Sequence, residues 1–329
     1  MKVDRLIKDA IYFEEFRKQK ASFESDIRVH EKLLAKHQQS SLSLRYSEEA
    51  KKKIPEINAI LEKEPPSPEL PPRQPLIKVC GMLEEIEILF TRGFFTDREY
   101  ETEEFVRKER SRHWGSVLLA VIGESAAAAV SSQGEIRQTD VFDFVKGKVN
   151  GVPFYGWFGR TTAKQGDYIE LAVVAKGGHY EAYALAVPEL RIISMLPRCY
   201  QSVRSKAADE IKGCFIMPVV IAAIVAVVGA FALGFNFDMG YFQLVGGVAA
   251  MTVLYSILAL PFTYRLSLKK PKPTNAMAQK IFTVLEMKNP EDVNLERTTK
   301  EVLKNKSDKQ NEDRVMPKKN LLSDYYYFY

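Results

Sequence analysis

The segment from Gly123 to Ala127, "GESAA", comes nearest to a catalytic motif in this sequence. It follows an apolar run and imitates the nucleophile elbow G-x-S-x-G, with the last glycine replaced by Ala127. Acyl transfer at Ser125 would need a histidine that takes the serine proton and an acid that orients this histidine. The one histidine downstream is His179, in a predicted Gly-Gly-His turn that no acid motif follows. We therefore interpret the match as chance and nominate no catalytic residue; a hydrolase built on Ser125 is the minor alternative.

The other residue types that carry chemistry show no spacing typical of a metal or cofactor site. The 329 residues include four histidines and three cysteines, without an HExxH, HxxxH or CxxC pattern. A Walker loop and a GxGxxG fingerprint are also missing from the sequence. Cys80, Cys199 and Cys214 are an odd number, which argues against a disulfide framework and fits a reducing compartment. The sequence thus predicts a non-enzymatic protein without cofactor or metal.

The charge pattern gives no indication of a nucleic-acid partner. Lys and Arg number 47 and Asp and Glu number 42, for a net charge of +5. A nucleic-acid interface would need a one-sided basic face, whereas the basic residues here are interleaved with acidic ones. We therefore expect no nucleic-acid binding.

Two apolar runs separate this chain from an ordinary charged globular protein. Residues 213–234 contain no charged side chain, and about 20 apolar residues form a helix of roughly 30 Å, the thickness of a bilayer core. A second run covers 241–262, after a short turn, so the two predicted spans form a hairpin within 213–263. The alternative is a buried hairpin in a soluble core, but such a core rarely holds two adjacent helices that are apolar all round. The runs therefore favour a transmembrane hairpin.

The flanks of the hairpin predict its orientation. Basic residues lie before the first run and after the second, and the turn has none, so both termini are expected in the cytoplasm of a multi-pass inner-membrane protein. The residues that carry this topology are Arg204, Lys206, Lys212, Arg265, Lys269, Lys270 and Lys272.

Small residues recur every four positions along the runs and would let helix backbones approach closely. These helix-packing candidates are Ala222, Ala226, Ala230, Gly234, Gly246 and Ala250. The possible pore-lining residues are Gln243, Thr252 and Ser256. One hairpin cannot enclose a pore, so conduction would require a homo-oligomer.

The remaining segments differ in period and composition. Residues 1–63 read as a helical arm, and 64–75, "EPPSPELPPRQP", as a stiff proline-rich linker, with an SH3-type ligand as the minor alternative. Residues 76–212 alternate as strands and predict a small antiparallel, barrel-like domain on the cytoplasmic side. The Ala-rich helix at 116–132 within it is predicted to be buried or interfacial, with a third membrane segment as the alternative. Residues 264–329 read as helical and then disordered. The predicted fold class is an α+β membrane protein with a helical N-terminal arm, a small antiparallel β-rich domain, a two-helix transmembrane hairpin and a helical C-terminal tail.

The order of these parts resembles a family of Gram-negative bacterial proteins labelled type VI secretion system effectors. The phrases that carry the resemblance are "HYEAYA", "RIISMLPRC" and the "IF…L…P…VNL" block, within residues 66–296. The resemblance brings no catalytic residues with it.

The resemblance implies one of two functions. The first is a toxin of bacterial competition, which inserts into the membrane of a rival cell and permeabilises it as an oligomer. The second is a resident inner-membrane immunity or accessory protein, a scaffold that binds a secretion-machinery or immunity partner through its β domain. The thin polar lining of the runs does not separate the two.

Overall fold

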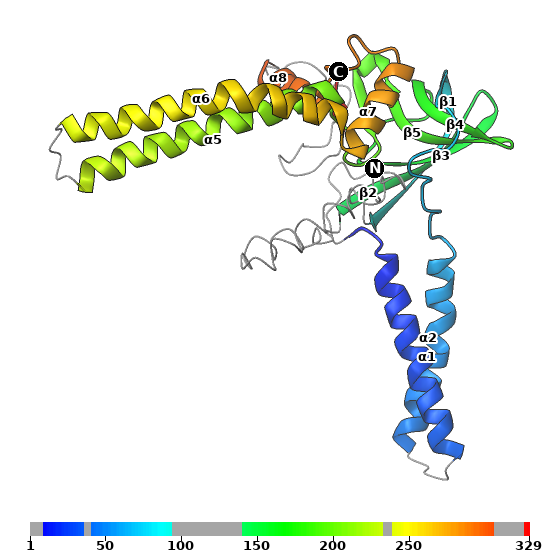
Figure 1. Ribbon diagram of the computed structural model, residues 1–329. Coiled ribbons are helices and arrows are strands. Elements are labelled where there is room, and N and C mark those ends of the chain that lie inside the picture. The colour runs from blue at the N-terminus through cyan, green and yellow to red at the C-terminus, as the bar shows by residue number, and fades with distance from the viewer. Residues whose placement is uncertain (1–8, 36–40, 94–139, 233–238, 306–325) are drawn as a thin grey trace.

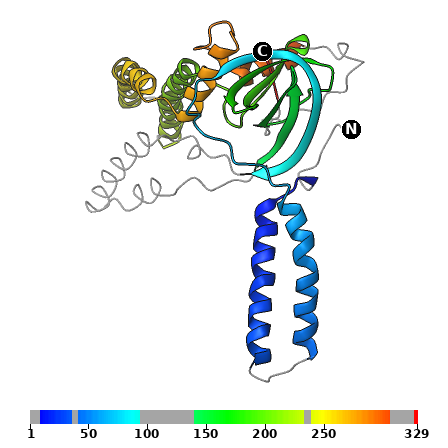
Figure 2. The ribbon, with the colours of Figure 1, turned by 90° about the vertical axis from the view of Figure 1, so that its right-hand side faces the viewer.

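The computed structural model describes residues 9–35, 41–93, 140–232, 239–305 and 326–329. The strands form a central barrel, and two helical hairpins extend from it in different directions (Figures 1 and 2). The predicted Ala-rich helix at 116–132, with the GESAA motif inside it, lies outside the described residues.

The first hairpin is the arm formed by α1 (Phe13–Ala35) and α2 (Ser41–Leu61). Pairs of opposite charge one turn apart stabilise its first helix, such as Glu14 with Lys18 at 3.2 Å. The arm is joined to the barrel at its base, where the Ile11 amide donates to the Phe90 carbonyl at 3.1 Å.

Five strands close into a barrel: β1 (Ile77–Gly93), β2 (Asp140–Val149), β3 (Val152–Phe158), β4 (Tyr168–Lys176) and β5 (His179–Val187). Neighbouring strands pair antiparallel in the order β3-β2-β1-β4-β5, and a parallel pairing of β3 with β5 closes the ring. This is the Greek-key arrangement of OB-type barrels, a fold that leaves the function open. The prediction of a β-rich, barrel-like domain is confirmed in this respect.

Two-residue turns fix the strand register. Asn150 and Gly151 join β2 to β3 with φ values of 50° and 75°, the left-handed backbone that a tight hairpin turn requires. Gly177 and Gly178 join β4 to β5 in the same way.

Gly156 allows the ring to close. A Cβ atom at this position would lie 2.4 Å from the backbone oxygen of Ala182, the residue it faces across the parallel β3–β5 pair. We expect Gly156→Ala to lower the free energy of unfolding by about 1–3 kcal/mol, because strand backbones cannot shift as a flexible side chain can. Urea unfolding would measure the loss, and Gly151→Ala is a useful comparison, since its Cβ meets nothing within 4 Å and only its backbone is strained. A wild-type midpoint for Gly156→Ala would contradict this role.

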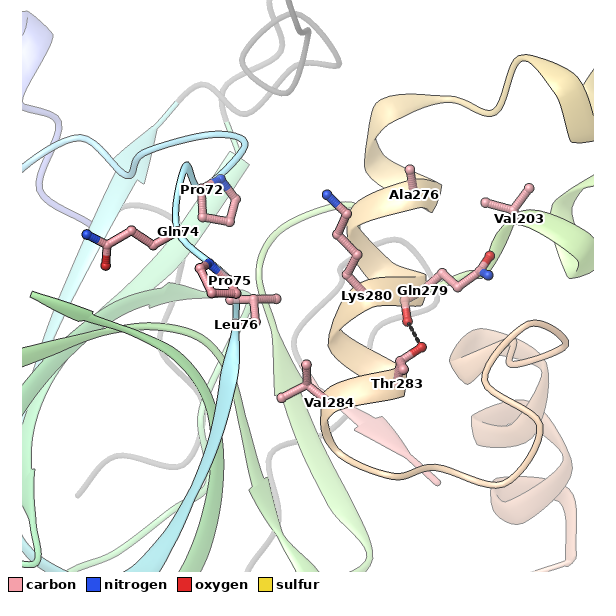
Figure 3. A pocket seen from close by; sticks show the side chains of 10 residues that line it. All are labelled: Pro72, Gln74, Pro75, Leu76, Val203, Ala276, Gln279, Lys280, Thr283 and Val284. Carbon is pink, nitrogen blue, oxygen red and sulfur yellow. Dashed lines mark hydrogen bonds between the residues drawn. The ribbon is translucent and has the colours of Figure 1, made fainter.

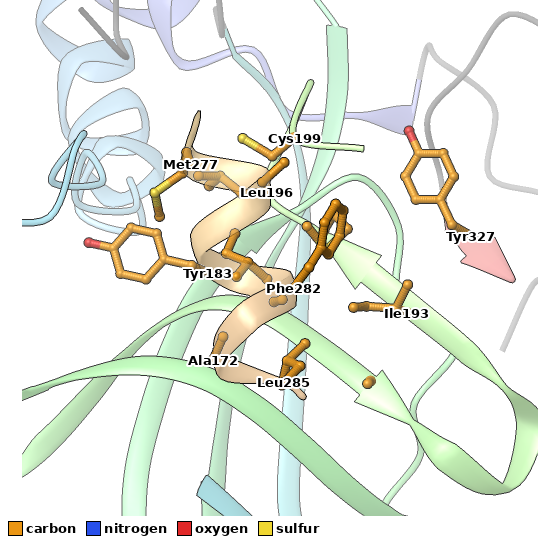
Figure 4. Close-up of a cluster of buried hydrophobic side chains, with 14 of the residues drawn as sticks. Ala172, Tyr183, Ile193, Leu196, Cys199, Met277, Phe282, Leu285 and Tyr327 are labelled. Atoms are coloured by element: carbon orange, nitrogen blue, oxygen red, sulfur yellow. The ribbon is translucent and has the colours of Figure 1, made fainter. Parts of the chain in front are cut away.

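The barrel wall separates two hydrophobic cores. The inner core fills the ring with side chains such as Phe154, Phe158 and Leu171. The outer core lies between the outer face of the wall and α7 (Pro273–Val284), and it also includes residues of β6 (Ile192–Met195) (Figure 4).

Residues 326–329, at the end of the predicted disordered tail, form structure, whereas residues 306–325 of that tail lie outside the described residues. Tyr327–Phe328 form β7, which pairs antiparallel with β6. The Phe328 amide donates to the hydroxyl of Thr299 in α8 (Leu295–Asn305) at 2.9 Å. The aromatic side chains of residues 326–328 are buried, and the removal of this apolar surface from water stabilises the packed position of the segment.

The second hairpin consists of α5 (Val203–Ala232) and α6 (Met239–Lys269). In the described parts of the chain, none of the helices combines the length and the apolar composition that crossing a bilayer requires. The predictions of an α+β membrane protein, of a multi-pass inner-membrane location with cytoplasmic termini, and of a pore are therefore wrong.

The physical reason lies in the helices to which the apolar runs belong. Both helices extend beyond the runs, and α5, which begins with a charged segment, also contacts α7. Ala207 in this segment is fully buried, and Ser267 of α6 donates to the Glu210 carboxylate of α5 at 2.5 Å. Composition alone did not distinguish a spanning hairpin from paired helices that extend out of a folded domain.

Candidate functional site

The structure spreads the predicted helix-packing residues over different environments. Ala226 and Ala230 are partly buried on α5, whereas Gly246 and Ala250 are exposed on α6. A Cβ atom on Gly246 would meet nothing within 4 Å. The side chain of Ala222 and the whole of Gly234 lie outside the description. Close packing through these residues therefore stays a prediction.

Two of the three predicted pore-lining residues have described side chains, so a shared polar lining stays a prediction. Gln243 is exposed, and the Thr252 hydroxyl donates to the Val248 carbonyl of its own helix at 2.9 Å. The side chain of Ser256 is not described.

The predicted topology residues lie at the base of the hairpin. Arg204 pairs with the carboxylates of Glu291 at 2.8 Å and Asp292 at 3.6 Å, and Lys212 lies 3.7 Å from Asp209. Lys206 is half-buried, whereas the basic residues after the second run are exposed: Arg265, Lys269, Lys270 and Lys272. Arg204 thus anchors α5 to the segment before α8.

Beyond its base, the α5–α6 hairpin exposes large apolar side chains on both helices. Phe231 of α5 is 67% exposed and Phe262 of α6 is 68% exposed. Other large apolar side chains that are exposed on these two helices are Ile216, Val220, Ile224, Val227, Val228, Met251, Leu254, Tyr255 and Ile257. Apolar patches of this kind mark interaction surfaces.

A groove of about 570 Å³ lies at the barrel, between the end of the proline-rich segment and α7. Lys280 and Val284 extend from α7 toward Pro72, Pro75 and Leu76 on the opposite wall (Figure 3). The other lining residues are Gln74, Val203, Ala276, Gln279 and Thr283. Lys280 is the one ionisable side chain among them, so the groove suits binding of an apolar segment rather than acid–base chemistry.

The sequence of α7 explains why it forms one wall of this groove. Pro273 occupies the first turn, where its missing amide hydrogen costs nothing. Met277, Ala278, Ile281 and Phe282 form a buried stripe at helical spacing, which leaves the opposite face for the groove. Asn275 fixes the start of the helix by donating to the Gln201 carbonyl at 2.8 Å.

The proline-rich segment, residues 64–75, crosses the outer face of the barrel wall, and we call it the strap. Lys176 of β4 lies 2.6 Å from the carboxylates of both Glu69 in the strap and Glu181 of β5. These bonds hold the pKa of Lys176 above its usual range, and the bond from Lys176 lowers the pKa of Glu69. Burial, followed by the charge of Glu181, raises the pKa of Tyr183 beside them. These pKa shifts keep Lys176 and Glu69 charged and Tyr183 neutral at neutral pH, which suits binding rather than proton transfer.

Sequence reasoning predicted a spacer where the structure has this strap. The sequence pattern that could have indicated the strap is the pair Tyr155 and Trp157, which alternate to the outer face of β3. Two large aromatic side chains on one face of a strand are usually covered by another segment of the protein. His179, which the sequence placed in a turn, is the first residue of β5 and stacks on Tyr155 at 5.3 Å.

Comparison of the chain with protein-family models, with curated proteins and with solved structures finds no match. Among the residues that the structure describes, no group of three or more His, Cys, Asp or Glu side chains is placed to hold a metal ion. The geometry of the hairpin, groove and strap is therefore what the functional conclusion rests on.

Proposed function

We propose that this chain is a non-enzymatic interaction protein that assembles with a second copy through its α5–α6 hairpin. The observation that carries the proposal is the apolar surface on both helices, of which Phe231 and Phe262 are the most exposed members. Between residues 213 and 262 the sequence has one charged residue, Asp238. A surface without charges selects a partner surface without charges, and the hairpin of a second copy provides one.

Two such hairpins would bury their apolar faces as a four-helix bundle, with the same patch used on both copies. The charged base of α5 limits the contact to the outer part of the hairpin, because Arg204 and its acidic partners are already paired within one chain. The barrel domains would remain outside the bundle and free to bind other molecules.

The experiment compares the full chain with the double variant Phe231→Glu, Phe262→Glu by sedimentation velocity. We expect the wild type to form an oligomer and the variant to dissociate at least tenfold more readily, because burying unpaired carboxylates is costly. Val29→Glu is the matched control, since Val29 is an exposed apolar residue of the arm. A monomeric wild type at tens of micromolar, or equal behaviour of both variants, would contradict the proposal.

The groove favours a second function, the binding of a partner protein by the barrel domain. Its apolar walls with Lys280 at the rim suit a segment that carries apolar side chains and one acidic group. This agrees with the accessory or immunity protein that the family resemblance implies, and the resemblance itself stays a prediction. The permeabilising function depended on membrane spans and is not continued.

A further inference from the structure

Side chains of the barrel bind the strap by its backbone. The indole Nε1 of Trp157 donates to the Pro66 carbonyl at 2.8 Å, and the Tyr183 hydroxyl donates to the Glu69 carbonyl at 2.9 Å. The Glu69 amide in turn donates to Glu181 Oε1 at 2.9 Å. The strap is therefore held as a bound peptide is held, by donors and acceptors that the surface presents to an extended chain.

The surface beneath the strap has the character of a proline-recognition groove. Trp157 and Tyr183 are 8% and 1% exposed, and Phe144 packs against Trp157 with ring centroids 5.3 Å apart. Aromatic grooves bind proline-rich segments because these segments are already extended and offer carbonyls without competing amide hydrogens.

Two further contacts define which peptide would fit. The Glu69 carboxylate accepts from Lys176 at 2.6 Å, and Leu70 packs against the outer core. A ligand therefore needs a proline whose carbonyl meets Trp157, an acid three residues later that meets Lys176, and an apolar residue after the acid. In the strap this pattern is P-S-P-E-L, from Pro66 to Leu70.

The occupant is less buried than the surface that it covers. Pro66 and Ser67 are exposed, and Glu69 and Leu70 are half-buried, whereas the aromatic residues below them are buried. We propose that the outer face of β3 and β5 is a binding site for extended peptides of the form P-x-x-E-L. In this state the chain's own strap occupies the site. A segment of the same form in a partner protein displaces the strap and binds in its place. This inference does not depend on the assembly of the hairpin.

In the wild type, a free peptide displaces the strap with difficulty because the strap is covalently attached to the domain. A tethered segment acts as though it were present at millimolar concentration, so a free peptide of equal affinity competes poorly. The test therefore needs a full-length variant in which the strap is weakened and the site is unchanged. Glu69→Ala with Leu70→Ala removes the ion pair of Glu69 with Lys176 and the packing of Leu70, and it leaves Trp157, Lys176, Glu181 and Tyr183 in place.

The probe is a fluorescent peptide of residues 64–75, EPPSPELPPRQP, followed by anisotropy. We expect the peptide to bind saturably to the weakened variant and at least tenfold more weakly to the wild type. A peptide that carries the same two alanines should bind to the weakened variant with a comparable loss of affinity. Adding Trp157→Phe to the weakened variant should also reduce affinity, since it removes the indole donor. Glu69→Gln, which changes only the charge, replaces the double variant if circular dichroism shows that the latter is unfolded.

Two results would overturn the proposal. One is the absence of saturable binding to a folded weakened variant up to millimolar peptide, or equal binding of both peptides, which would make the strap an ordinary part of the packing. The other is a dimer that forms only when the strap is intact and persists in Phe231→Glu, Phe262→Glu, which would assign the site to the strap of a second copy.

Discussion

Phe282→Ala is expected to lower the free energy of unfolding by about 3–5 kcal/mol, the range for truncating a buried aromatic residue. The side chain is fully buried and projects from α7 into the outer core, between the helix and the barrel wall (Figure 4). Because Phe282 belongs to the stripe that seats α7, its loss also loosens one wall of the groove. Denaturant unfolding followed by circular dichroism would measure the change.

The control for this prediction is the next residue in the same helix. Thr283 is exposed toward the groove, and its hydroxyl donates to the Gln279 carbonyl at 2.8 Å within the helix (Figure 3). Thr283→Ala should change the free energy of unfolding by no more than about 0.5 kcal/mol. If Phe282→Ala costs less than about 1 kcal/mol, α7 does not depend on this contact and the two-core description of the barrel domain fails.

The barrel could be predicted as far as its turns and periodicity allow, and no further. Asn150-Gly151 and Gly177-Gly178 dictate tight turns through backbone conformations that other residues adopt at a cost. The parallel closure through Gly156 could not be predicted, because it joins strands whose relation depends on the whole ring. The pairing of β7 with β6 joins residues more than 130 positions apart, and no local pattern encodes it.

The hairpin and the strap show opposite failures of local reasoning. The apolar runs around Phe231 and Phe262 were interpreted from composition, which records that side chains avoid water and not what covers them. The strap was interpreted as a spacer because proline-rich segments are extended by themselves. Its role depends on Trp157 and Tyr183, which lie on strands distant from it in the sequence. Local sequence patterns do not predict such contacts, so the site could not be predicted.

Lys176→Met is expected to release the strap and to lower the free energy of unfolding by about 3 kcal/mol, because it removes the cation that the carboxylates of Glu69 and Glu181 share. Glu181 has a side chain that is 4% exposed, so its charge would be left buried and facing the like charge of Glu69. Proteolysis with a glutamate-specific protease at Glu69 would measure release, and urea unfolding the stability. The double variant Lys176→Met, Glu181→Gln should recover much of the loss, since the amide oxygen still accepts from the Glu69 amide hydrogen and no buried charge remains.

The same cluster predicts how strap binding depends on pH. The pKa of Glu69 is lowered from 4.5, so its contribution is complete above that value and is lost as the pH falls through the lower pKa of the folded state. The pKa of Lys176 is raised from 10.5, so its contribution is complete below that value and is lost as the pH rises further. The strap should therefore be bound most tightly between about pH 5 and pH 10. If Glu69 is protected from cleavage at neutral pH equally well in the wild type and in Lys176→Met, the aromatic donors hold the strap without the ion pairs.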